Sequence, residues 1–131
     1  MKGRLRDDRG IATIEFAILA PVLMLILLGI IQIGIYIYTT VDVRQATREG
    51  GRQLTLLRND SSAAAEVKTK VAAALGGEVK QSNVAVTFST PPPWSPGATV
   101  TMTVTYPDAL SVMGIKITSG PIKDTAQVTV E

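Results

Sequence analysis

The 131-residue chain contains no histidine and no cysteine, and only 5% of its residues are aromatic. The absence of cysteine excludes disulfides and thiol nucleophiles, and the absence of both residue types excludes zinc sites built on imidazole or thiolate ligands. Without histidine, a catalytic triad with an imidazole base is excluded as well. Basic and acidic residues nearly balance, with 13 against 11 and a formal charge of +2. Because the basic residues are spread along the chain, we expect no nucleic-acid partner.

One long hydrophobic segment dominates the first third of the chain. From Phe16 to Val41, 26 consecutive residues include no Asp, Glu, Lys or Arg, whereas about 20 apolar residues are enough to cross a bilayer. A buried helix of a soluble protein is the alternative. A removable secretory signal fits less well, since its apolar region has only about 7 to 15 residues. We therefore predict a membrane helix over 11–41, with a kink at Pro21, which lacks a backbone donor.

The residues before the apolar segment form a short polar leader over 1–10, which ends in glycine and whose composition favours an extended conformation. Basic residues flank the apolar segment in equal number, with Lys2, Arg4, Arg6 and Arg9 before it and Arg44, Arg48, Arg52 and Arg58 after it. A long following domain crosses the membrane largely regardless of its charge, so the short N-terminal cluster is the better guide. We therefore expect a cytoplasmic N-terminus and an extracytoplasmic C-terminal domain.

The helical period continues beyond the apolar segment and predicts a membrane-proximal amphipathic helix over 42–57. One face of this helix carries apolar or small residues at helical spacing, namely Val43, Ala46, Gly50, Leu54 and Leu57. The other side carries a basic stripe, in which Arg44, Arg48 and Arg52 recur every four residues. The stripe is either a solvated face or a contact surface for anionic lipid headgroups or an acidic helix.

Residues 60–131 predict a small α+β domain. Apolar residues recur at helical spacing from Ala63 to Leu75, and the period then changes to two. Alternating residues predict strands around 84–89, 99–106 and 126–130, with a weaker candidate at Ile115 and Ile117. We therefore expect three or four antiparallel strands. So small a domain has a marginal core, which implies that the membrane-proximal helix also packs on the sheet.

A proline-rich loop, TPPPWSPG, extends from Thr90 to Gly97 between two predicted strands and carries Trp94, the only tryptophan. Two interpretations compete for this residue. Trp94 either caps the edge of the small core or is exposed as a contact for a partner protein.

The acid at the start of the apolar segment, Glu15, also has two interpretations. A carboxylate at this position can be tolerated by reaching toward water and by the positive N-terminal end of the helix. Alternatively, cleavage after Gly10 leaves a new amine on Ile11. That amine lies one helical turn from Glu15, or faces the Glu15 of a neighbouring subunit, and the two charges neutralise each other in low dielectric.

The segment RGIATIEFAILAPVLMLILLG, from Arg9 to Gly29, resembles the prepilin-type N-terminus of the TadE-like pseudopilins, which accompany tight-adherence (Tad/Flp) type IV pili. A second signature of that family, Ala-x-Arg-Glu-Gly-x-Arg, is matched by Ala46, Arg48, Glu49, Gly50 and Arg52. The sequence departs from the family at Gln32, where many members have an acid. After about Leu57 it carries no motif of the family.

The resemblance implies a pilin-like minor pseudopilin that a prepilin peptidase cleaves between Gly10 and Ile11. Glu15 would then be the assembly acid, directly before Phe16, which opens the apolar segment. The partners implied are the membrane, the peptidase, other minor pseudopilins, the major Flp pilin and the inner-membrane assembly platform. The implied location is the bacterial cytoplasmic membrane, or the pilus after assembly. Adhesion is the associated process.

A different class of function is an uncleaved, signal-anchored envelope protein that acts as a tether or binding module. An enzyme fits the sequence poorly, because the acids after the predicted strands, Asp108 and Asp124, have no histidine, clustered carboxylate or phosphate-binding glycine loop beside them. We therefore expect no catalytic residues, no metal, no cofactor and no small-molecule substrate.

Overall fold

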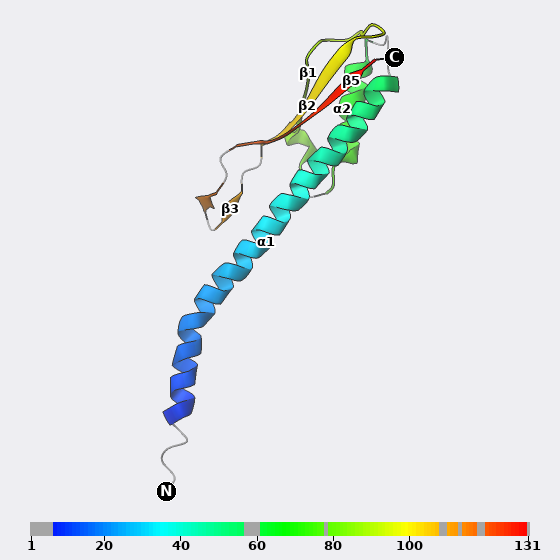
Figure 1. Ribbon diagram of the computed structural model, residues 1–131. Coiled ribbons are helices and arrows are strands. Elements are labelled where there is room, and N and C mark those ends of the chain that lie inside the picture. The colour runs from blue at the N-terminus through cyan, green and yellow to red at the C-terminus, as the bar shows by residue number, and fades with distance from the viewer. Residues whose placement is uncertain are drawn as a thin grey trace.

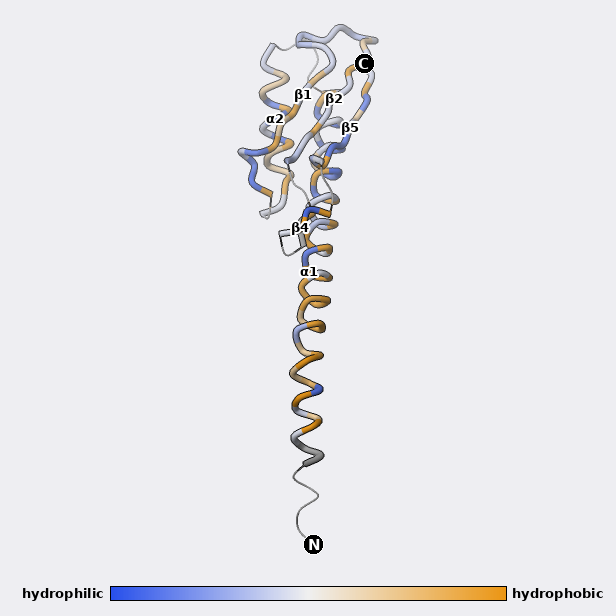
Figure 2. Tube along the Cα trace, turned by 90° about the vertical axis from the view of Figure 1, so that its left-hand side faces the viewer, coloured by the Kyte–Doolittle hydropathy of each residue, from blue (hydrophilic) through white to orange (hydrophobic). Residues whose placement is uncertain are grey.

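A computed structural model describes residues 7–56, 61–77, 79–107, 110–112, 114–117 and 120–130. One helix, α1, runs without interruption from Asp7 to Leu56, and a compact α+β unit packs against one side of its C-terminal part (Figure 1). Figure 2 shows that hydrophobic residues predominate along the free part of α1, whereas polar and apolar residues alternate where the other elements lie beside it. The predicted continuation of the membrane helix into a membrane-proximal helix is confirmed.

The N-terminal end of α1 differs from the expected extended leader, because residues 7–10 are already helical. The rest of the predicted leader, residues 1–6, lies outside the described part of the chain. The helix also continues through Pro21, and its axis bends within the blue N-terminal portion that contains this residue (Figure 1).

A second helix, α2, spans Ala63–Ala74, and a short 3-10 turn follows at Gln81–Asn83. Three strands then form one antiparallel sheet in the order β1-β2-β5, with bounds of Ala85–Phe88, Thr99–Tyr106 and Ile122–Thr129. The predicted number of three or four strands is confirmed at three. The elements pack as an α+β, pilin-like arrangement.

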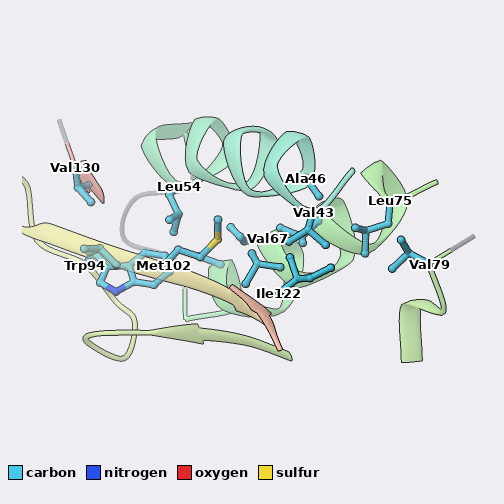
Figure 3. Close-up of a cluster of buried hydrophobic side chains, with 14 residues drawn as sticks. Val43, Ala46, Leu54, Val67, Leu75, Val79, Trp94, Met102, Ile122 and Val130 are labelled. Atoms are coloured by element: carbon cyan, nitrogen blue, oxygen red, sulfur yellow. The ribbon is translucent and has the colours of Figure 1, made fainter. Parts of the chain in front are cut away.

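The central strand β2 shows the predicted alternation, because Val100, Met102 and Val104 are buried while the threonines between them face outward. The inward residues meet α1 and α2 in one hydrophobic core (Figure 3). Helix α1 contributes Val43, Ala46 and Leu54 to this core. The expectation that the membrane-proximal helix completes the core of the small domain is confirmed.

The weak strand candidate around Ile115 forms a separate hairpin instead of joining the sheet as a fourth strand. Its strands are β3, Ser111–Val112, and β4, Ile115–Lys116. The turn between them contains Gly114 at φ 83°, a left-handed conformation that glycine adopts at little cost. The hairpin extends beyond the end of the sheet, on the side of the domain nearer to the N-terminus (Figure 1), and β3 lies against α1.

Candidate functional site

The first candidate region is the entrance segment, which we define as residues 10–16 of α1. All of its side chains are exposed, and Ile11 and Phe16 are 55% and 66% accessible. The α+β unit lies at the other end of α1 (Figure 1). The entrance segment is therefore free to contact a bilayer, a processing enzyme or a neighbouring subunit.

Gly10 has no packing reason to be glycine. A Cβ atom added there would have no other heavy atom within 4 Å. Glycine inside a helix is less favourable than alanine by roughly 0.5 to 1 kcal/mol, so the fold by itself favours a larger residue at this position. A requirement for glycine at residue 10 must come from outside the folded chain.

Ile11 and Glu15 are separated by one helical turn of α1, which brings their side chains about 5 to 6 Å apart at Cβ. An amine created on residue 11 by cleavage would lie on the same side of the helix as the Glu15 carboxylate. The local geometry thus permits the charge pairing expected from the sequence, within one subunit or between two exposed helices.

The second candidate region is the signature face, which we define as residues 46–52 of α1. Ala46 and Gly50, the two small residues of the family signature, are buried. A Cβ atom on Gly50 would come within 2.5 Å of Val71 Cγ2 and 2.7 Å of Met102 Cε. The glycine therefore allows α1 to approach α2 and the central strand closely, so two of the five signature residues have a packing role.

The charged members of the signature point away from the core. Arg48 and Arg52 are exposed, and Arg52 Nε lies 3.4 Å from the carboxylate of Glu49. Gln53 Nε2 donates a hydrogen bond of 2.8 Å to the same carboxylate. The Gln53 hydrogen bond, followed by the interactions with Arg52, lowers the pKa of Glu49 below its ordinary value. The predicted basic stripe is thus present on the surface, with Glu49 holding one of its cations.

Sequence reasoning did not identify three residues that extend this packing. Gly51 faces β5, and a Cβ atom there would lie 3.2 Å from Ala126 Cβ. Asp42 is only 8% exposed, and its Oδ2 atom has no hydrogen-bond partner among the described residues. That carboxylate lies against Gly76 in the segment after α2. The adjacent pair Gly50-Gly51 was a visible signal of close approach on two sides, whereas the Asp42–Gly76 contact had no local signal.

Trp94 lies in the core, with 2% of its surface accessible. Its Nε1 donates a hydrogen bond of 2.9 Å to the carbonyl of Thr90. Its ring centroid is 5.4 Å from that of Phe88, with an interplanar angle of 53°. The interpretation in which Trp94 is presented to a partner is therefore wrong, because the proline-rich loop folds back and places the indole in the core (Figure 3).

The entrance segment and the signature face are not brought together. They occupy one continuous helix, and 31 residues separate Glu15 from Ala46, or about 46 Å along the axis at 1.5 Å per residue. One region lies on the apolar part of α1 and the other inside the folded unit. Among the described residues, no group of three or more acids forms a candidate metal site.

A helix long and apolar enough to cross a membrane, continuous with a pilin-like α+β unit, defines a protein with a single candidate membrane span in the described part of the chain. Residues 10–52 match the family model of TadE-like proteins, so over this segment the chain is similar to that family. The match begins at Gly10 and ends at Arg52, so it includes both candidate regions. No curated protein and no solved structure matches the chain.

The family match favours a pseudopilin role related to the Tad pilus. TadE-like pseudopilins are generally structural proteins and not enzymes. The matched segment is therefore the part of the chain from which a function is argued, and residues 53–131 lie outside the family match.

Proposed function

We propose that this chain is a minor pseudopilin that takes part in assembly of a Tad/Flp type IV pilus. The observation that carries the proposal is the family match from Gly10 to Arg52, combined with a glycine at residue 10 that no contact in the fold requires. A prepilin peptidase on the cytoplasmic side cleaves after Gly10 and frees the amine of Ile11. The apolar helix first holds the subunit in the membrane and later packs against other pilin subunits.

Glu15 is the assembly acid in this proposal. Its exposed position on the apolar helix places it where a neighbouring subunit packs. A buried carboxylate without a partner is costly, whereas a carboxylate paired with an amine is compensated. The pairing therefore favours insertion of a cleaved subunit next to another pilin, and Phe16 begins the hydrophobic contact surface.

The membrane-spanning part of α1 is shorter in this proposal than the segment 11–41. Tyr36 packs against the hydrophobic core and Thr39 is 3% exposed, so the helix has entered the folded unit by these positions. The 20 residues from Phe16 to Ile35 span about 30 Å, the thickness of the hydrocarbon layer. Glu15 then lies at the cytoplasmic boundary, and the α+β unit begins at the opposite surface.

The signature face connects the folded unit to the membrane helix. Because Gly50 and Gly51 allow close contact with α2 and the sheet, the unit is held firmly on α1 and is displayed on the extracytoplasmic side. The partners in this proposal are the prepilin peptidase, other minor pseudopilins, the major Flp pilin and the inner-membrane assembly platform. The chain remains in the bacterial cytoplasmic membrane or enters the pilus.

The competing function is a tether or binding module that stays anchored in the envelope by an uncleaved signal. The same exposed apolar helix fits this function, because membrane anchoring needs neither Gly10 nor Glu15. The state of the N-terminus in the native bacterium separates the two functions.

The first prediction concerns processing at Gly10. The mass of the membrane-extracted wild-type protein should correspond to a chain that begins at Ile11. Gly10→Leu should retain Met1 and still insert in the membrane, because a bulky residue blocks the peptidase and not the span. Gly34→Leu is the matched control, since a Cβ atom at Gly34 also meets no heavy atom within 4 Å, and it should be cleaved normally. If the wild-type protein retains Met1, the pseudopilin proposal is wrong, and the uncleaved tether or binding module is the remaining function.

A further inference from the structure

The hairpin β3–β4 exposes apolar side chains that no described part of the chain covers. Ile115 is 71% accessible and Ile117 is 57% accessible. Ile115 begins the two-residue strand β4, Lys116 ends it, and Ile117 follows directly. Contiguous exposed apolar side chains mark sites that interact with a membrane or another protein. Ile115 and Ile117 on this short hairpin are a candidate site of this kind.

The position of the hairpin shows which partner is near. It projects from the end of the sheet toward the N-terminal side of the domain, on the side to which the apolar part of α1 extends (Figures 1 and 2). Strand β3 lies against α1. The hairpin is therefore beside the stretch where α1 leaves the folded unit.

The exposed surface of α1 continues this apolar region. Ile35 and Ile37 are 51% and 57% accessible, and they belong to the same helix that crosses the bilayer. In a membrane-inserted chain, the hairpin then lies on the side of the domain that faces the bilayer (Figure 1).

We propose that the β3–β4 hairpin is a second membrane contact, in which Ile115 and Ile117 enter the interfacial layer of the bilayer. Lys116 lies between them and is exposed, so its ammonium group can reach anionic lipid headgroups while the two isoleucines enter the acyl boundary. The hairpin and α1 then hold the domain at two points, which restricts its tilt and rotation on the membrane. The proposal depends on membrane insertion and not on pilus assembly.

The test uses the absence of cysteine from the chain. The full-length variants Ile115→Cys and Ile117→Cys are labelled with an environment-sensitive fluorophore. They are then reconstituted at a low protein-to-lipid ratio in vesicles of phosphatidylcholine and phosphatidylglycerol. Lipids with a spin label near the headgroup are added as quencher. We expect blue-shifted emission at both positions and a quenching several-fold larger than at a reference site in the domain.

Thr129→Cys is the matched control, because it is an exposed strand residue at the end of β5, beside the C-terminus and away from the hairpin. Equal quenching at Ile115, Ile117 and Thr129 would overturn the proposal. The proposal would also be overturned if the hairpin labels became buried only at a raised protein-to-lipid ratio. In that case a second copy of the chain, and not lipid, would cover the hairpin. Circular dichroism of each labelled variant verifies that the domain has remained folded. A processing defect at Gly10 leaves these readings unchanged, so failure of the pilin proposal is separately visible.

Discussion

Two glycines of α1, Gly10 and Gly50, lie in opposite surroundings. Gly50 lies where a side chain would collide with Val71 and Met102, whereas Gly10 has open space around it. Both belong to the segment that matches the TadE-like family. The packing of Gly50 explains its presence within the chain itself, and the presence of Gly10 is explained in our proposal by an external peptidase.

The second prediction concerns the pH dependence of Glu49. Its pKa is lowered in the folded state by the hydrogen bond from Gln53 and by Arg52. A carboxyl group of this kind stabilises the fold above its unfolded-state pKa, and the stabilisation is lost as the pH falls through the folded-state pKa. Glu49→Gln should therefore flatten the acid side of the stability profile. Because Glu49 is at the surface, the effect should be small and should weaken with added salt.

Urea unfolding of the detergent-solubilised chain at a series of pH values measures this effect. Glu66→Gln is the control, since Glu66 is an exposed acid of α2. If the acid-side slope of unfolding free energy against pH is unchanged in Glu49→Gln, or changes equally in both variants, Glu49 does not contribute to the pH dependence of stability.

The third prediction concerns Trp94, whose burial makes it a structural residue. Trp94→Ala should destabilise the domain by about 3 to 5 kcal/mol, as for other large-to-small core substitutions of aromatic residues. Trp94→Phe should cost less, because it keeps a ring near Phe88 and loses only the donor to Thr90. Thermal unfolding followed by circular dichroism measures both. A melting temperature of Trp94→Ala equal to that of the wild type would contradict the core position.

At the scale of elements, α1 performs two tasks along a single 50-residue helix. Its N-terminal part is exposed and apolar, whereas its C-terminal part supplies one wall of the core of the domain. No linker separates the two parts, so a force or rotation applied to the membrane segment is transmitted directly to the folded unit. The small residues of the signature face, Ala46 and Gly50, lie where α1 packs against the rest of the folded unit.

The fourth prediction tests that connection at Gly50. Gly50→Ala should destabilise the domain by about 1 to 3 kcal/mol, because the added methyl group overpacks the contact with Val71 and Met102. Gly34→Ala is the control, and it should be neutral or stabilising by roughly 0.5 to 1 kcal/mol, since alanine is the better helix former. Thermal unfolding compares the two. Equal melting temperatures would mean that α1 does not approach α2 this closely.

At the scale of the whole molecule, the distance between the two candidate regions determines how a subunit works. In our proposal, the entrance segment meets other subunits within the membrane, and the signature face holds the displayed domain. Assembly and display are therefore separable by mutation. A substitution in one region should leave the task of the other region intact.

The fifth prediction uses this separation. Glu15→Val should still be cleaved and should keep the stability of the domain. Its co-purification with other pilins should fall by about tenfold, which corresponds to about 1.4 kcal/mol of lost association energy. Gln32→Val is the matched control, because it also replaces a polar residue of the apolar helix. If Glu15→Val co-purifies with other pilins as well as the wild type does, Glu15 has no role in assembly and is only tolerated at the membrane boundary.

The sequence by itself determined the features that depend on local periodicity. The apolar segment, the helical face with Val43 and Ala46, and the alternation along β2 could all be predicted, because each depends on the geometry of a single element. The class of fold followed from these patterns, and the resemblance to TadE-like proteins followed from the two signatures.

Only the tertiary structure decided features that depend on contacts between distant segments. It placed Trp94 in the core, kept Ile115 out of the sheet, and showed that Tyr36 already packs against the domain. It also separated the packed Gly50 from the unconstrained Gly10. Local spacing placed Gly50 on the apolar face but did not show its contacts, because the burial of a side chain is determined by what packs against it from elsewhere in the chain.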